Sequence, residues 1–154
     1  MSLVEGDAAP AFTMAATGGR TVSLAGLQGR PFVLYFYPKA DTPGCTTEAC
    51  AFQEALPALG GIGIEVIGVS KDAMKPIERF AAKHGLTFPL ASDADGVAEA
   101  YGAWVAKSMY GKAYLGIDRS TFLVGKDGRV ARAWRKVKVP GHAAEVMAAA
   151  KALG

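Results

Sequence analysis

Residues 31–50 read PFVLYFYPKADTPGCTTEAC, and this stretch predicts the centre of the fold. Its first part, PFVLYFYP, is a continuous aromatic and branched run bounded by prolines, which is typical of a strand buried on both faces. Such a strand belongs in the middle of a sheet. Beyond the second proline, apolar residues recur at helical spacing and predict a helix to about Leu59. These residues are Ala49, Phe52, Ala55 and Leu56.

Outward from this stretch, strand and helix patterns alternate along the chain. FTMAA, a TGGR turn and TVSL predict a short hairpin at 12–24, and GIEVIGVS predicts another buried strand at 63–70. Pro57 is expected to kink the first helix or end it near its last turn. The remaining predicted elements are a helix with Pro76 in its first turn and Gly85 as its left-handed stop, a strand at 87–92, a short helix at 93–102, a hairpin at 120–134 and an amphipathic helix at 142–154.

This order predicts an α/β protein with a central mixed β-sheet flanked by helices and an N-terminal β-hairpin, which is the plan of the thioredoxin-like fold. No repeat, linker or low-complexity stretch interrupts the pattern, so residues 1–154 are expected to form a single domain. In open α/β sheets the reactive site lies beyond the carboxyl ends of the strands, where loops lead into helix N-termini. The segment that holds Cys45 is such a loop.

Composition and charge exclude several classes of protein. The content of 51% hydrophobic and 20% charged residues is ordinary for a soluble globular protein. The net charge is +3 and the basic residues are scattered, apart from RKVK at 135–138, which does not favour nucleic acid. FVLYFY is too short for a membrane span, and the N-terminal residues lack an apolar core of signal-peptide length. We therefore expect a cytoplasmic protein, in which the two cysteines are catalytic or redox-active.

Cys45 is expected in the first turn of the helix. Asp41 or Thr42 can cap that helix. Pro43 suits its first position, and Gly44 lets the chain turn tightly. Unpaired backbone N–H groups and the helix dipole favour an anion there, and the thiolate is the form of cysteine that attacks. The alternative is a buried, inert thiol, although such thiols seldom lie in a Pro-Gly turn at a helix start.

Cys50 follows five positions after Cys45, and this spacing argues against a permanent disulfide. In an ideal helix the two Cα atoms are roughly 8–9 Å apart, beyond the limit of about 7 Å for a bridge. Closing so small a loop would stabilise the fold by only about 2 kcal/mol, and the unwound helix would offset much of that. A transient disulfide, formed after a conformational change, fits the spacing better. A metal site is less favoured, because only His84 and His142 could join the cysteines and both are interpreted as structural.

The motif P-x-x-x-T-x-x-C, formed by Pro38, Thr42 and Cys45, resembles the active-site signature of the peroxiredoxins. FYPKADTPGCTTEACAFQ is similar to the Q-type subfamily, the bacterioferritin comigratory proteins. The resemblance continues through most of the chain, in order and spacing. The further similar segments are GVSKD at 68–72, FPLASD at 88–93, YGKAYLGIDRSTFLV at 110–124 and WRKVKVPGHAAEV at 134–146.

The resemblance implies a role for each signature residue in reducing a peroxide. Cys45 would be the nucleophile, with its backbone N–H helping to hold the peroxide, and Thr42 would orient the substrate through its hydroxyl. Arg119 would supply a fixed positive charge beside the sulfur, and Glu48 would hold Arg119 in a charge-assisted pair. Pro38 is expected to shield the thiolate from water. Taken alone, Thr42 could instead be a plain helix cap and Arg119 a surface charge. Glu48 could be an acid that favours the helix dipole, and Pro38 could simply end the strand.

The implied reaction is that of a thiol peroxidase. Cys45 would form a sulfenic acid, Cys50 would attack it to give an intramolecular disulfide, and thioredoxin or a glutaredoxin-like dithiol protein would restore both thiols. No cofactor is implied, since no Gly-rich dinucleotide fingerprint follows a strand. The intramolecular disulfide favours a monomer. Two alternatives stay open: a thioredoxin-like disulfide reductase, which is expected to use C-x-x-C, and a non-catalytic redox sensor, which would not require Thr42 and Arg119.

Overall fold

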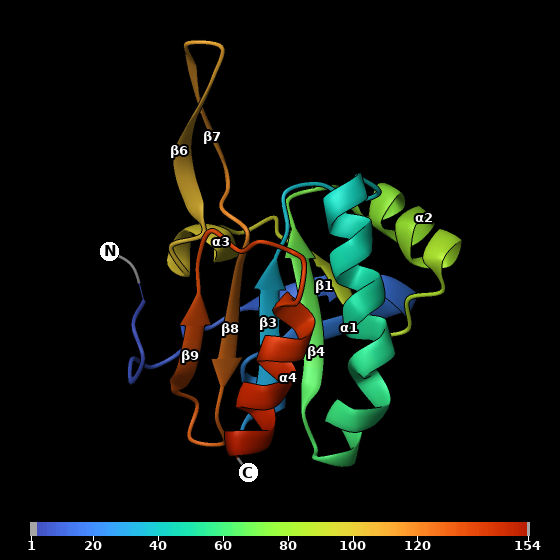
Figure 1. Ribbon diagram of the computed structural model, residues 1–154, viewed down its shortest axis with the longest axis vertical. Helices are drawn as coiled ribbons and strands as arrows, with labels where there is room; N and C mark the ends of the chain where they lie inside the picture. The colour runs from blue at the N-terminus through green and yellow to red at the C-terminus, as the bar shows by residue number, and fades with distance from the viewer. Residues whose placement is uncertain (1–2, 154) are drawn as a thin grey trace.

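A computed structural model describes residues 3–153 and contains a seven-stranded mixed sheet. Its strand order is β2-β1-β5-β4-β3-β8-β9. Figure 1 shows β4, β3, β8 and β9 side by side in this order. The predicted buried run forms β3 (Phe32–Phe36), in which every residue is buried. β3 pairs in parallel with β4 (Glu65–Ser70) and antiparallel with β8 (Ser120–Val124), so it lies inside the sheet as the sequence predicts.

The other elements follow the predicted alternation of strands and helices. The remaining strands of the large sheet are β1 (Thr13–Ala16), β2 (Arg20–Ser23), β5 (Leu90–Ser92) and β9 (Val130–Trp134). The helices are α1 (Pro43–Gly61), α2 (Met74–His84), α3 (Val97–Ala100) and α4 (His142–Leu153), with short 3-10 turns η1 (Thr17–Gly19) and η2 (Ala25–Leu27).

Each face of β3 meets its own hydrophobic cluster, because successive strand side chains point to opposite faces. Tyr35 points to the face covered by α1, α2 and α4, where its ring stacks on Phe52 of α1 at a centroid distance of 4.7 Å. Phe36 points to the opposite face and contacts Tyr101, just after α3, at 5.5 Å. The sheet is therefore covered on both sides, and no helix within residues 3–153 is long and apolar enough to cross a membrane.

Several local predictions are confirmed by this structure. The N-terminal hairpin, the β8–β9 hairpin and the final helix all form. Gly85 ends α2 in the left-handed region with φ 63°, which only glycine adopts at little cost.

Pro57 does not end α1, which continues to Gly61. Its ring lies on the exposed side of the helix, and the buried Leu59 holds the last turn on the core.

One pair of strands was not predicted from the sequence. β6 (Trp104–Met109) and β7 (Lys112–Ile117) form a separate antiparallel hairpin outside the seven-stranded sheet. Most of its residues are exposed or half-buried, so the alternation of apolar and polar residues that marks a half-buried strand is weak here. In Figure 1 this hairpin projects well beyond the body of the molecule.

Replacing Gly68 with alanine is expected to destabilise the fold by roughly 1–3 kcal/mol, the usual cost of overpacking. A Cβ on Gly68 of β4 would lie 2.7 Å from Leu90 Cδ2 and 2.8 Å from Tyr35 Cζ, and the tyrosine ring is fixed against Phe52. Gly60→Ala is the matched control: it lies in α1 with nothing within 4 Å of a new Cβ, so it should stabilise by about 0.5–1 kcal/mol. Urea unfolding of both variants measures the two changes, and equal effects would contradict this packing.

Candidate active site

Cys45 lies in the first turn of α1 and is buried, with 2% of its surface exposed. Pro43 occupies the first or second helical position, as predicted. Arg119, immediately before β8, donates a hydrogen bond from Nη2 to Cys45 Sγ at 3.3 Å. The thiol therefore has two sources of positive potential, the start of the helix and a guanidinium.

Arg119 is held in place by Glu48, one helical turn after Cys45. Its Nη1 donates to Glu48 Oε1 at 2.6 Å, so the pair suggested by the sequence is present. Pairing of Phe36 with Ser120 across β3 and β8 sets Arg119 at the carboxyl end of β3, beside the start of α1. Gly44 leaves room for it, because a Cβ there would lie only 3.3 Å from Arg119 Nη2. Close approach of this arginine accounts for a glycine at that position.

Thr42 occupies the N-cap position of α1, but its side chain does not cap the helix. Its hydroxyl donates instead to the carbonyl oxygen of Lys39 at 2.8 Å. The prediction of a side-chain cap from Thr42 or Asp41 is therefore wrong. Without such a cap, the first-turn N–H groups can donate to a bound ligand, and the hydroxyl oxygen of Thr42 can still accept a hydrogen bond.

The loop that precedes α1 is tied to two other elements by contacts that were not predicted from the sequence. Asp72, after β4, accepts a hydrogen bond from the backbone N–H of Ala40 at 2.7 Å. Asp41 has a positive φ of 60°, a strained conformation for a residue with a side chain. Its carboxylate holds Lys83 at 3.1 Å and His84 at 3.0 Å, both at the end of α2. The only sequence signal for these contacts was the placement of Asp72 two residues after a buried strand and of Asp41 in the loop before the first helix.

Pro38 and Cys50 occupy the edges of this site. Pro38 is exposed, and the side chains buried in one cluster with Cys45 include Tyr35 and Tyr37. Cys50 is half-buried, and both cysteines have free thiols. Because both cysteines belong to the same helix, a bond between them requires local unwinding of α1.

The geometry combines a buried thiol, a paired arginine, a helix start without a side-chain cap and a hydroxyl oxygen that can still accept a hydrogen bond. A protein-family model described as the AhpC/TSA family matches residues 5–133, most of the chain. The chain belongs to the AhpC/TSA family of peroxiredoxins. Similar proteins include Peroxiredoxin Bcp of Xanthomonas campestris, 49% identical over 88% of this chain and 86% of its own length. Peroxiredoxin Bcp of Bacillus subtilis is 44% identical over 96% and 94% of the two chains.

Solved structures of peroxiredoxins share this fold. Peroxiredoxin Q of Xanthomonas campestris superposes with a TM-score of 0.87 at 47% identity, covering 92% of this chain and 90% of its own. A mutant PrxQ of Xylella fastidiosa superposes with a TM-score of 0.92 at 41% identity, covering 99% and 98%. These similarities confirm the predicted thioredoxin-like fold and the predicted resemblance to Q-type peroxiredoxins. The protein is accordingly a thiol-dependent peroxidase.

Glu48 is an unusual acid in this peroxiredoxin, because only 1% of its surface is exposed. Burial raises its pKa above the ordinary 4.5 to about 7, and the Arg119 guanidinium opposes that rise. Its Oε2 has no hydrogen-bond partner within residues 3–153. Burial lowers the pKa of Arg119, but the interactions with Glu48 and Cys45 outweigh burial. The pKa of this arginine is therefore raised. The cation beside the thiol is therefore permanent, whereas its carboxylate partner titrates near neutrality.

Both histidines of the peroxiredoxin have partners within the protein, in keeping with their interpretation as structural residues. His84 pairs with Asp41, and the Nε2 atom of His142 is hydrogen-bonded to Thr121 Oγ1 at 2.7 Å. Burial lowers the pKa of His142, which favours its neutral ring. In the described part of the chain, no three His, Cys, Asp or Glu side chains gather as a metal site would require.

The buried Glu48 is expected to make folding stability fall as pH rises. Its pKa is raised in the folded state, so the stabilising protonated form is fully present below pH 4.5 and is lost as pH passes through about 7. The fall is up to about 3 kcal/mol at 1.4 kcal/mol per pKa unit. Glutamine does not titrate, so Glu48→Gln should lack this pH-dependent fall. From pH 4.5 to 8, the free energy of unfolding of the variant should therefore rise relative to that of the wild type. Urea unfolding across this range measures it; a constant difference would contradict the raised pKa.

Proposed function

We propose that Cys45 is the peroxidatic cysteine of this enzyme and that its substrates are hydrogen peroxide and organic hydroperoxides. The observation that carries the proposal is the 3.3 Å contact between the Arg119 guanidinium and Cys45 Sγ at an uncapped helix start. That contact sets a permanent cation beside the nucleophilic sulfur, and the same cation can stabilise charge on a departing oxygen. One of the similar structures concerns alkyl peroxide reduction by the bacterioferritin comigratory protein of Xanthomonas campestris, which supports an organic hydroperoxide as one substrate.

In the first step the Cys45 thiolate attacks one peroxide oxygen, and the O–O bond breaks as the S–O bond forms. The second oxygen leaves with the electron pair, takes a proton and departs as water or an alcohol, which leaves Cys45 as a sulfenic acid. The Cys45 backbone N–H and the Arg119 guanidinium donate to the peroxide oxygens. The Thr42 hydroxyl already donates a hydrogen bond to the backbone carbonyl oxygen of Lys39. Its oxygen therefore accepts the hydrogen bond of the peroxide O–H.

In the second step Cys50 resolves the sulfenic acid. Its thiolate attacks Cys45 Sγ, an S–S bond forms, and the sulfenic oxygen leaves as water after taking a proton. The intact helix keeps the two Cα atoms roughly 8–9 Å apart, so the first turns of α1 must unwind before this bond can form. The half-buried position of Cys50 eases its movement out of the helix.

In the third step a dithiol protein, thioredoxin or a glutaredoxin-like protein, reduces the Cys45–Cys50 disulfide. The partner supplies two electrons and two protons and becomes a disulfide itself. Because both cysteines come from one chain, the cycle needs no second subunit, and we propose a single-domain monomer. A reducing compartment such as the cytoplasm would supply the partner in its dithiol form.

Cys50→Ser is expected to block steady peroxide turnover with thioredoxin but not the first oxidation of Cys45. One equivalent of hydrogen peroxide should add one oxygen to the Cys50→Ser protein and should convert the wild type to a species lacking two hydrogens. Cys45→Ser should do neither. Intact mass after trapping of sulfenic acid distinguishes these outcomes. Equal loss of the first oxidation in both variants would refute the division of roles, and oxidation without steady turnover in the wild type would favour a redox sensor.

Thr42→Val is expected to lower the second-order rate of Cys45 oxidation roughly a hundredfold, the usual effect of losing one positioned hydrogen bond to a reacting oxygen. Valine keeps the shape of threonine but has no hydroxyl. Thr42→Ser is the matched control and should retain most of the rate, since it keeps the hydroxyl. Stopped-flow oxidation under single-turnover conditions gives both rates. Wild-type rates in Thr42→Val would show that the hydroxyl does not contact the peroxide.

A further inference from the structure

The β6–β7 hairpin is fixed at its base and uncovered at its tip. At the base, the Lys71 ammonium lies 4.9 Å from the centre of the Trp104 ring. The backbone N–H of Asp118 donates a hydrogen bond to the carbonyl oxygen of Ala103 at 2.7 Å. Ile117 is buried in the cluster on the α3 side of the sheet. Strands of six residues reach about 20 Å, so the outer half stands clear of the body (Figure 1). Two-stranded hairpins without a packing partner are at best marginally stable in water.

Beyond its base, the hairpin exposes large apolar side chains along both strands and at the turn. Met109 is 57% exposed, Leu115 is 60% exposed and Tyr110 is 97% exposed. Together with Tyr114 they make up four of the seven large exposed hydrophobic residues within positions 3–153. We call these four residues the hairpin tip. Apolar side chains gathered on one projecting element mark an interaction surface more often than isolated ones do.

Tyr110 is an energetically unfavourable residue in the turn that joins the two strands. It adopts φ 52° and is followed by Gly111 with φ 78°, so both turn residues have positive φ. Tight hairpin turns of this kind favour asparagine followed by glycine, because a bulky side chain is strained at positive φ. The tyrosine ring is almost fully exposed and gains little packing in return. Folding alone does not account for this residue, whereas contact with another molecule does.

The two faces of the hairpin differ in charge. Register across the strands sets Lys107 opposite Tyr114 and Met109 opposite Lys112, so both lysines share one face with two apolar side chains. The other face carries Leu115 and Ala106, which follow on from Trp104 and Ile117 at the base. Residues 104–117 contain no Asp or Glu. A protein that covers the face with the two lysines therefore needs apolar side chains together with acidic ones.

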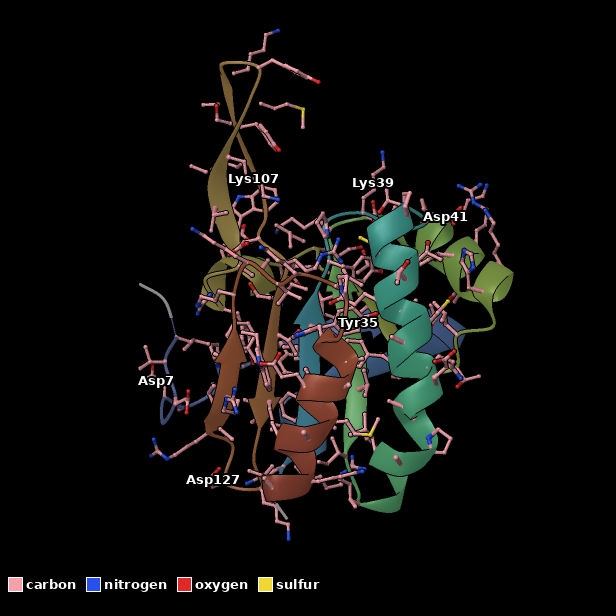
Figure 2. All side chains as sticks on the ribbon, in the orientation of Figure 1. Asp7, Tyr35, Lys39, Asp41, Lys107 and Asp127 are labelled. Atoms are coloured by element: carbon pink, nitrogen blue, oxygen red, sulfur yellow. The ribbon has the colours of Figure 1, made fainter. Side chains whose placement is uncertain are left out.

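The hairpin also stands at the end of the molecule that holds the reactive thiol. β7 ends at Ile117, and two residues later Arg119 contacts Cys45. In Figure 2, Lys107 on the hairpin and Lys39 beside the start of α1 lie at this same end, opposite Asp127. A protein that brings a dithiol to the start of α1 thus comes within reach of the hairpin.

We propose that the hairpin tip and Lys112 are the docking surface for the dithiol protein that reduces the Cys45–Cys50 disulfide. This inference rests on the third step of the proposed function. The partner would present an apolar patch with an acidic rim close to its own thiols. A second copy of this chain is a poorer occupant, because pairing two hairpins would bring lysines of like charge together without an acid on either side.

The test compares a protein reductant with a small one. Tyr110→Asn combined with Leu115→Ser removes two apolar contacts, while asparagine suits the turn and should preserve the hairpin. With thioredoxin or glutaredoxin as the varied substrate, KM for the protein dithiol should rise roughly tenfold or more, as for loss of interface anchors. The peroxide KM and the rate with dithiothreitol should not change. Ile62→Ser, an exposed apolar residue at the far end of α1, is the matched control and should leave both unchanged.

Charge reversal tests the acidic rim independently. Lys112→Glu should raise KM for the protein dithiol and weaken its dependence on salt, whereas Lys126→Glu, in the exposed turn of the β8–β9 hairpin, should do neither. Wild-type KM values in both hairpin variants would overturn the docking proposal. So would a dimer in sedimentation experiments that the double variant abolishes, since that assigns the surface to a second copy. If neither protein dithiol recycles the wild type while dithiothreitol does, the recycling step itself is wrong.

Discussion

The contact of Arg119 with Cys45 and Glu48 is the interaction on which the site depends. It joins residues 71 and 74 positions apart, so the fold has to create it. Antiparallel pairing of β3 with β8 brings Arg119 to the carboxyl end of β3, and the loop after β3 turns the chain into α1 at the same place. Gly44 then lets the guanidinium approach the helix. A thiol, a cation and a helix start thus meet because two strands have one particular register.

In the proposed cycle, the same helix holds this site together and later unwinds at its start. Its first turns carry Cys45, Glu48 and Cys50, whereas Phe52 is stacked on Tyr35 and buried in the core. Unwinding up to Cys50 would break the Arg119–Glu48 pair and a few backbone hydrogen bonds but would leave the aromatic contact of Phe52 intact. The stacked Phe52 therefore marks a natural boundary between the part of α1 that can open and the part that stays packed.

The sequence predicted the central strands and their helices because long apolar runs and helical spacing report burial directly. It failed where burial is weak. The β6–β7 hairpin has lysines, serine and small residues among its exposed positions, so no periodic pattern marks it. The side chain of Thr42 could not be placed either, because a hydroxyl can bond to several nearby backbone groups at similar cost. The arginine and its partner were named from the family resemblance, whereas the tethers through Asp41 and Asp72 depend on loop geometry that spacing does not reveal.

In the proposed cycle, the offset of five positions from Cys45 to Cys50 separates peroxide reduction from disulfide formation in time. On a helix this spacing turns Cys50 about 140° away from Cys45, so its sulfur cannot reach a new sulfenic acid while α1 is intact. The sulfenic acid then waits for local unwinding, and further peroxide can oxidise it irreversibly during that interval. Contacts that stabilise the helix start, such as the Arg119–Glu48 pair and the tether of Ala40 to Asp72, lengthen the wait. The contacts that hold Cys45 in its reactive position would thus also prolong its exposure to overoxidation, so a more rigid helix start would delay resolution and make the enzyme less durable.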